Sequence, residues 1–306
     1  MSSVDEAGVL YVPKRSTYLS PTQTIGYSFG HILNDLCSGI WFSYLLVFMG
    51  LVLKFSSQNA GLLLLIGQVA DGISTTFVGI ASDRVKCCNY GTKKTWHLIG
   101  TICILISFPF IFNPNLGDPN ADETSKLVYF SIFIIVFQFG WAAVQISHLS
   151  LIPILTPISN ERIGLNSLRY SFTVISNIAV YLITWLVLNI DMASDNSHSN
   201  SSNEAKNSRL GPDSIPQFRL IVLVLVGAGT LFSILFHVMV HEHSSLVNEN
   251  DQPINMHDEH LKWKDWFSHP QFYIIGVLYM ATRLSINLTQ VYMPFYLQFT
   301  LDLPKV

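Results

Sequence analysis

The apolar run at residues 60–81 reads AGLLLLIGQVADGISTTFVGIA, and one acidic residue, Asp71, interrupts it. A helix of about 20 predominantly apolar residues crosses the hydrocarbon core of a bilayer. This run is long enough to do so, and a polar, basic segment follows it directly. We therefore predict a transmembrane helix here, with an ionisable group at membrane depth.

Six further windows of the chain have the same apolar character. They are residues 24–53, 96–112, 127–153, 165–190, 218–240 and 271–299. Only 12% of the 306 residues are charged, whereas soluble domains carry about a quarter charged residues. The sequence therefore predicts an all-α polytopic membrane protein. The first and fourth windows are long and contain glycine or polar residues, which predicts tilted or broken helices there.

The connections between the windows indicate the orientation of the chain. Lysine and arginine are more frequent in the connections that face the cytoplasm when the N-terminal segment, residues 1–23, is placed there. The Ser- and Asn-rich loop 191–217 then faces the lumen, and it holds an N-glycosylation acceptor at Asn200. The polar stretch 241–270 is predicted to be a cytoplasmic central linker.

Polar residues recur at helical spacing inside five of the windows. The first window carries His31, Asn34 and Asp35 at positions i, i+3 and i+4, which share one helix face. The window 60–81 carries Gln68, Asp71 and Thr75, and the window 127–153 carries Gln138, Gln145 and His148. Arg169 lies in the window 165–190, and Arg283 and Asn287 lie in the window 271–299. Ionisable groups at membrane depth are costly and usually face protein or a water-filled cavity. We predict that these stripes line a cavity for a solute or a coupling ion; interhelical hydrogen bonding without transport is the alternative.

Two kinds of charged residue add to this prediction. Histidine, with a free pKa near 6.5, gains a proton in an acidic lumen and loses it in the cytosol. His31 or His148 beside a carboxylate would therefore link solute movement to a proton gradient. Arg283 is expected to pair with a carboxylate across the cavity.

A motif follows the second window. It consists of Gly79, the pair Asp83-Arg84, Gly91 and the pair Lys93-Lys94. This pattern resembles the loop signature of the major facilitator superfamily. The resemblance implies that Asp83 ends its helix and helps to latch a cytoplasmic gate against the opposite half of the protein.

The wider sequence resembles one branch of that superfamily, the glycoside–pentoside–hexuronide cation symporters. Asp71 stands eight residues before Gly79 as in that branch, and the segment from Leu151 to Arg169 also resembles it. Closer still is the resemblance to a lysosomal and melanosomal member of the superfamily, which implies import of cysteine into the organelle. Thr75 stands where the sugar symporters carry a second carboxylate, and His31 where they often carry an acidic residue. Both differences argue against sodium-coupled sugar transport, which remains an alternative.

The superfamily fold has two six-helix halves with the substrate between them. This chain supplies one such half at 24–240, then the linker 241–270, a seventh span at 271–299 and a short tail at 300–306. We therefore expect a partial, poorly active form of a carrier. The alternatives are a seven-span receptor, or a regulatory half-transporter that associates with a full-length copy.

Other classes of function find no support in the sequence. The loops show no nucleophile–base arrangement and no metal-ligand spacing, so neither an enzyme, a cofactor nor a metal site is expected. The basic residues form no long run that would bind nucleic acid. The expected partners are a small-molecule solute, protons and the lipid bilayer.

Overall fold

The computed structural model describes residues 19–84, 90–114, 121–195, 210–242 and 267–301. Throughout this described part the regular structure is helical, with no strand. The elements are α1 (Pro21–Phe29), α2 (Ile32–Val47), the π-helix η1 (Phe48–Val52), α3 (Ser57–Arg84), α4 (Thr92–Ile111), α5 (Glu123–Leu155), α6 (Ser159–Asp195), the 3-10 turn η2 (Pro212–Ser214), α8 (Ile215–Met239) and α10 (Pro270–Phe299). They form seven spans long and apolar enough to cross a membrane. The predicted all-α polytopic architecture is confirmed, and the chain is a multi-pass membrane protein.

The first span is broken between α1 and α2, at Gly30 and His31. The interruption leaves carbonyl groups of the last turn of α1 free to accept hydrogen bonds from other helices. Gly30 is required here because a Cβ atom would meet the Phe236 and His148 side chains at 2.6 and 2.8 Å. The break predicted for the first window is thus confirmed. The fourth window forms one continuous helix, α5, with Pro153 only near its end.

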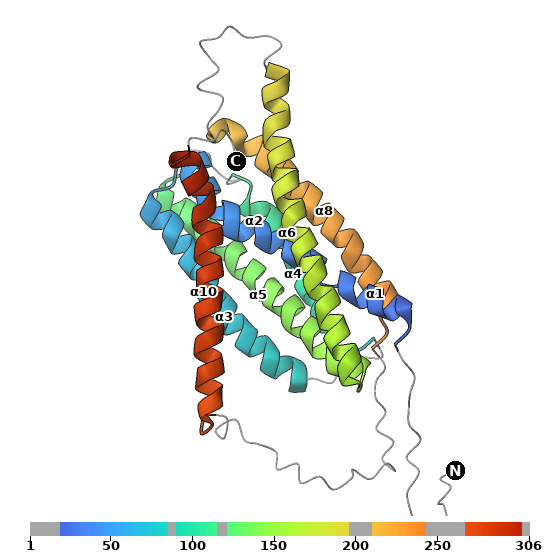
Figure 1. Cartoon of the computed structure of the whole chain (residues 1–306). Helices are drawn as coiled ribbons and strands as arrows, with labels where there is room; N and C mark the ends of the chain where they lie inside the picture. The colour runs from blue at the N-terminus through green and yellow to red at the C-terminus, as the bar shows by residue number, and fades with distance from the viewer. Residues whose placement is uncertain (1–18, 85–89, 115–120, 196–209, 243–266, 302–306) are drawn as a thin grey trace, which may run out of the picture.

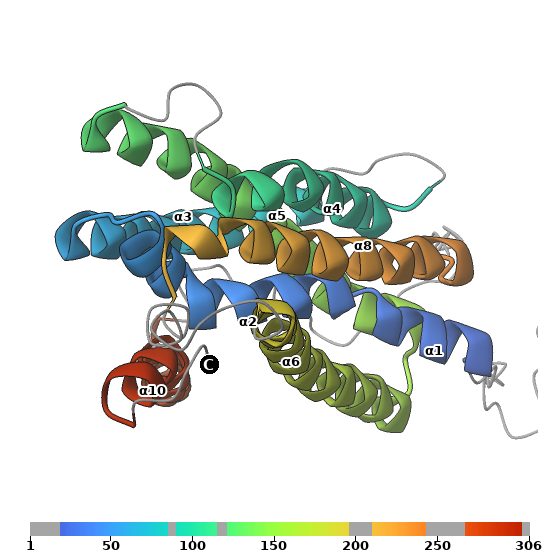
Figure 2. The ribbon, with the colours of Figure 1, turned by 90° about the horizontal axis from the view of Figure 1, so that it is seen from above.

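The first span is also the most buried one. Its most apolar window is 78% buried, whereas the corresponding window of α10 is 0% buried. In the view from above, α6 and α10 lie on the opposite side of α2 from α4 and α5 (Figure 2). The helix α2 therefore brings side chains into contact with both groups, as its central place in Figure 1 also shows.

Small residues allow the closest helix pair, α4 and α5, to approach. A Cβ atom on Gly100 would lie 2.6 Å from the carbonyl oxygen of Gly140, so neither position has room for a side chain. Such crossings are common in membranes, where packing rather than water drives helix association. The crossing fixes α5, which carries His148, against α4, which carries His97.

Large apolar side chains cover the outer surface of the bundle. Ile73 on α3, Leu182 on α6 and Leu231 on α8 are each at least 60% exposed. In water such a surface would drive association, but lipid is as apolar as these side chains. The predicted glycosylation acceptor, Asn200, and most of the linker lie outside the described residues.

Candidate functional site

A buried polar cluster joins α2 to α6 at the centre of the bundle. We call His31, Asp35, Arg169 and Thr173 the central cluster. The Nδ1 atom of His31 lies 2.9 Å from Oδ2 of Asp35, and the Thr173 hydroxyl donates to that same oxygen over 2.9 Å. The Nη2 atom of Arg169 donates to Nε2 of His31 over 2.8 Å. His31 and Asp35 are almost fully buried, so these contacts hold a carboxylate and a guanidinium inside the membrane with one imidazole between them.

The partners of His31 determine where its proton lies. A guanidinium carries only donors, so the Nε2 atom that faces Arg169 must be an acceptor. The Asn34 amide nitrogen, at 3.4 Å from the same atom, is a second donor. The neutral imidazole therefore carries its hydrogen on Nδ1, towards Asp35. This tautomer is assigned from the partners, which is how histidine protons are placed.

A second histidine, His148 on α5, lies beside the central cluster. Its ring centroid is 5.6 Å from that of His31. Its Nε2 atom donates to the Tyr27 carbonyl over 2.7 Å, and the Tyr27 hydroxyl donates to the His148 carbonyl over 3.0 Å. The Tyr27 carbonyl also accepts the Gly30 N–H over 3.1 Å at the end of α1, so the bond from His148 is its second. The Nδ1 atom of His148 is buried and has no partner among the described residues.

Two further histidines come close to this site and were not singled out from the sequence. The Nε2 atom of His97 on α4 lies 2.8 Å from the Gly30 carbonyl oxygen. Its Nδ1 atom lies 3.1 Å from Nε2 of His237 on α8. Each is a lone histidine near the end of a span, which is usually an interfacial residue. Only the packing of α4 and α8 around the break at Gly30 brings them together.

Aromatic residues line a small space on the other side of α2. Trp41, Phe42 and Trp141 enclose it together with the buried amide of Gln138, and it is too narrow to admit a water molecule. Ordinary ligand pockets are about 300 Å³ or more, so this space alone does not hold a solute. The indole nitrogens of both tryptophans are buried without a partner among the described residues, and they are donors available at its wall.

Arg283 reaches this region from α10. Its guanidinium carbon lies 5.7 Å from the Phe42 ring centroid and 5.9 Å from that of Trp141, within the range of cation–π attraction. The pairing predicted for Arg283 is not formed as a direct ion pair within the part of the chain that the structure describes. Its charge still acts on Asp71 and His31 through space.

The stripe on α3 is less enclosed. Asp71 is half-buried and accepts a hydrogen bond from the Thr75 hydroxyl one turn later, over 3.2 Å. Gln68 is exposed. On α5, Gln145 is half-buried and lies one turn before His148. The structure thus brings His31, Asp35, Arg169 and His148 together, and leaves Asp71 and Gln68 at the edge of the site.

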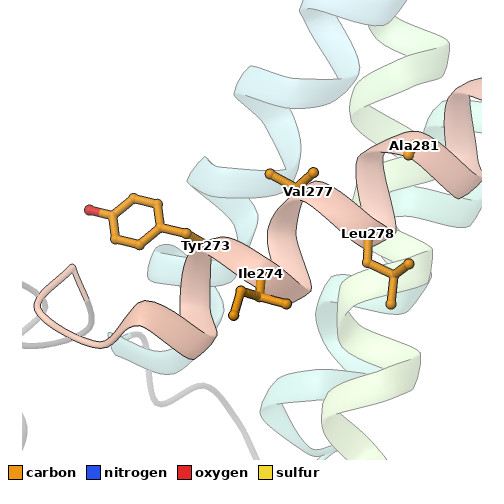
Figure 3. A pocket seen from close by; sticks show the side chains of 5 residues that line it. All are labelled: Tyr273, Ile274, Val277, Leu278 and Ala281. Atoms are coloured by element: carbon orange, nitrogen blue, oxygen red, sulfur yellow. The ribbon is translucent and has the colours of Figure 1, made fainter.

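The two faces of α10 differ sharply. Arg283 and Asn287 are half-buried against the bundle, as the predicted stripe requires. The other face is apolar, and a groove along it is lined by Tyr273, Ile274, Val277, Leu278 and Ala281 (Figure 3). Its position on the least buried span is that of a surface in contact with lipid or with another apolar helix.

The predicted gate motif forms a clamp at one end of the bundle. We call this the Asp83 end. The Lys93 ammonium donates to Oδ1 of Asp83 over 2.6 Å and to the carbonyl and hydroxyl oxygens of Ser82 over 3.1 Å each. Asp83 therefore pairs with a residue of its own motif. Arg84 is exposed, and the latch towards an opposite half stays a prediction.

A carboxylate three residues beyond the end of α8 completes the clamp. Glu242 accepts hydrogen bonds from the backbone N–H groups of Lys93 and Lys94, over 3.3 and 3.0 Å, at the N-terminus of α4. An anion is favoured there by the free N–H groups and the helix dipole. Gly91 precedes this helix with a φ of 105°, a conformation that favours glycine. The motif glycine and lysines thus join α3, α4 and α8.

Comparison with known proteins identifies the relatives of this chain. Residues 26–305 match the family model described as MFS/sugar transport protein. The mouse protein named major facilitator superfamily domain-containing protein 12 is 45% identical over 98% of this chain and 63% of its own length. The human protein of that name is 45% identical over 94% of the chain and 61% of its own length. The isoprimeverose transporter of Lactiplantibacillus pentosus is 26% identical over 51% of the chain.

Proposed function

Since the chain belongs to the MFS/sugar transport protein family, we propose that its central cluster and Arg283 form part of the binding site of a small amino-acid-like solute. Cysteine, imported into lysosomes and melanosomes, is the proposed solute. The chain spans about three fifths of the length of the curated relatives it matches. The activity of the whole carrier is therefore part of this proposal.

The observation that carries the proposal is the presence of both charge signs at membrane depth around α2. Arg169 and Arg283 supply cations, and Asp35 and Asp71 supply carboxylates. Such groups in a span mark substrate or ion pathways. Arg283 has no direct carboxylate partner among the described residues and Asp71 has only Thr75. A zwitterion offers a carboxylate to the first and an ammonium to the second.

The central cluster supplies a link to protons. In the neutral state Arg169 occupies the only free lone pair of His31, on Nε2. A proton added to His31 must occupy that same position, so proton binding and the Arg169 contact exclude each other. Protonation would release Arg169, whose guanidinium would then join Arg283 in binding the carboxylate of a solute. His31 would hold this proton when the site faces an acidic lumen and release it towards the cytosol.

The alternatives are weaker. The symporter-like relatives are 22 to 26% identical over about half of the chain, whereas the vertebrate relatives match it almost throughout at 44 to 45% identity. Thr75 also replaces the second carboxylate that a sodium–sugar site would use as an oxygen ligand. The family match leaves the seven-span receptor without support.

Binding and uptake of radiolabelled cysteine test the proposal. The chain, and the mouse relative with the same substitutions at its aligned positions, would be expressed in cells and assayed in isolated lysosomes and in detergent. Arg283→Ala and Asp71→Asn should each weaken binding by about tenfold or more, because a charge-assisted hydrogen bond contributes about 1.5–3 kcal/mol. Arg219→Ala is the matched control, because Arg219 binds Asn113 far from the site.

The outcomes separate the parts of the proposal. Cysteine binding that persists unchanged in both variants would exclude Arg283 and Asp71 from the solute site. Uptake of a sugar but not of cysteine would favour the sugar symporter. A tagged chain that remains at the cell surface would contradict the lysosomal location.

A further inference from the structure

A continuous row of hydrogen bonds runs from the surface at the Asp83 end to the break in the first span. The Tyr90 hydroxyl lies 2.7 Å from Nδ1 of His237. The Nε2 atom of His237 lies 3.1 Å from Nδ1 of His97, and Nε2 of His97 lies 2.8 Å from the Gly30 carbonyl oxygen. Tyr90 is 41% exposed, whereas His97 is fully buried. The row therefore crosses from solvent to the interior through side chains alone.

The direction of every hydrogen bond in the row follows from its inner end. A carbonyl oxygen only accepts, so Nε2 of His97 carries a hydrogen. In the neutral ring Nδ1 of His97 is then an acceptor, and Nε2 of His237 must donate to it. Nδ1 of His237 is likewise an acceptor, so the Tyr90 hydroxyl donates. Burial raises the pKa of Tyr90, which keeps this hydroxyl protonated.

The inner end of the row lies next to an unused acceptor. The His97 and His148 ring centroids are 6.1 Å apart, and Nδ1 of His148 is buried without a partner among the described residues. Beyond it, the His31 ring centroid is 5.6 Å from that of His148. Four imidazoles from four elements thus follow one another, and the last of them belongs to the central cluster.

We propose that Tyr90, His237 and His97 form a proton path that connects solvent at the Asp83 end with His148 and the central cluster. The proposal rests on the proton link suggested for His31, and it adds the residues through which the proton travels. Imidazoles suit this task because each ring accepts a proton on one nitrogen while releasing another from its second nitrogen.

The transfer steps conserve protons at each ring. His237 takes a proton on Nδ1 from the Tyr90 hydroxyl, which regains one from solvent, and passes its Nε2 proton to Nδ1 of His97. His97 then carries a proton on both nitrogens. A turn of its ring away from the Gly30 carbonyl brings a proton to Nδ1 of His148. His148 then passes a proton from Nε2, on turning from the Tyr27 carbonyl, to Nε2 of His31 as Arg169 leaves that atom. Return of both rings to their starting tautomers resets the path.

Charged groups surround the path and oppose the build-up of positive charge on its histidines. Lys94 lies on the same helix as His97; its ammonium donates to the His237 carbonyl over 3.1 Å and lies 4.3 Å from the Tyr90 ring centroid. Glu242 from the end of α8 faces the backbone of α4 at the same point. At the inner end, Arg169 acts on His148 from α6. A proton on the path therefore lies between the cations Lys94 and Arg169, so each histidine holds it only briefly.

The experiment follows proton arrival at His31 and needs no solute. The chain is placed in lipid nanodiscs with ring-labelled histidine, and infrared difference spectra are recorded after a rapid drop in pH; the His31 band is assigned by its loss in His31→Gln. His97→Gln and His237→Gln keep donor and acceptor atoms but cannot relay a proton. We expect each to slow protonation of His31 by about tenfold or more, the scale of positioned proton transfer. His241→Gln, an exposed histidine at the same end, is the matched control and should leave the rate unchanged.

A milder variant tests the path in case the histidine variants misfold. Tyr90→Phe removes only the outermost hydroxyl and should slow the rate about twofold to threefold, because water replaces that donor. Unchanged rates in His97→Gln and His237→Gln would overturn the path and point to entry from the other end of the bundle. A His31 that binds no proton at all would overturn the proton link and the path together. Cysteine binding is measured separately, so its failure would contradict the solute site and leave the path standing.

Discussion

The central cluster and the Asp83 end both place a carboxylate near a cation, in opposite surroundings. At the centre the neutral His31 imidazole lies between Asp35 and Arg169, whereas Lys93 contacts Asp83 directly. At the centre, the side chains of His31 and Asp35 are 7% and 6% exposed. At the Asp83 end, the Asp83 side chain is 74% exposed and only its partner, Lys93, is buried. A charge without water must keep its partner or lose several kcal/mol, whereas an exposed pair contributes little. In the first arrangement we propose that His31 binds either Arg169 or a proton. The second arrangement holds helices together.

The largest expected effect is at the centre. Arg169→Ala leaves the buried Asp35 with no cation in its cluster, although the neutral His31 imidazole separates the two charges. We expect it to lower the free energy of unfolding by about 3 kcal/mol, the lower end for a broken buried pair. Unfolding in mixed detergent micelles measures this loss. Arg162→Ala is the control, because the Arg162 side chain donates to the backbone carbonyl of Thr156 and takes no part in the central cluster. Equal losses in the two variants would mean that burial does not distinguish the two regions.

The next effect belongs to the backbone of the Asp83 end. Gly91→Ala places a side chain at a φ of 105° and against Glu242, which should cost about 1–2 kcal/mol of unfolding free energy. Gly79→Ala serves as its control, because Gly79 is helical and nothing lies within 4 Å of its Cβ position. That variant should be neutral or slightly more stable. A Gly91→Ala chain as stable as the parent would show that the clamp is not rigid.

A comparable effect is expected from the hydroxyl of the central cluster. Thr173→Val keeps the shape of the side chain and removes the hydrogen bond to Asp35, a loss of about 1–3 kcal/mol for a buried charged acceptor. The double substitution with Asp35→Asn should lose less than the sum of the two single ones. Strict additivity in that cycle would argue that the two side chains do not interact.

The smallest effect is expected at the exposed carboxylate. Asp83→Asn should change the unfolding free energy by less than about 1 kcal/mol, because Asp83 faces water and Lys93 retains its two contacts with Ser82. The same micelle titration measures it, with a series in salt as the control. A loss as large as that of Arg169→Ala would indicate that Asp83 has a further partner.

The candidate site could be predicted from the sequence where it depends on one helix. His31 and Asp35 share a face because they are four residues apart, and the structure pairs them. Arg169 was recognisable as a charge at membrane depth, but its contact with His31 depends on how α6 crosses α2. His97 and His237 gave no periodic signal, since each stands alone in its span. Their pairing depends on the break at Gly30, around which α4 and α8 pack.

Hydrophobic length alone predicted seven spans, and the described residues form seven helices long and apolar enough to cross a membrane. A bilayer accepts such helices because their backbones are satisfied internally. The spacing of polar residues placed His31 and Asp35 on one helix face, whereas on α3 Gln68 is exposed and Asp71 only half-buried. Only the tertiary structure decided which inward groups meet, since contacts between helices depend on crossings set by small residues such as Gly100 and Gly140. It paired Asp83 with Lys93, a residue of its own motif, in an ion pair. It also joined four histidines, far apart in the chain, into one row that ends at the central cluster.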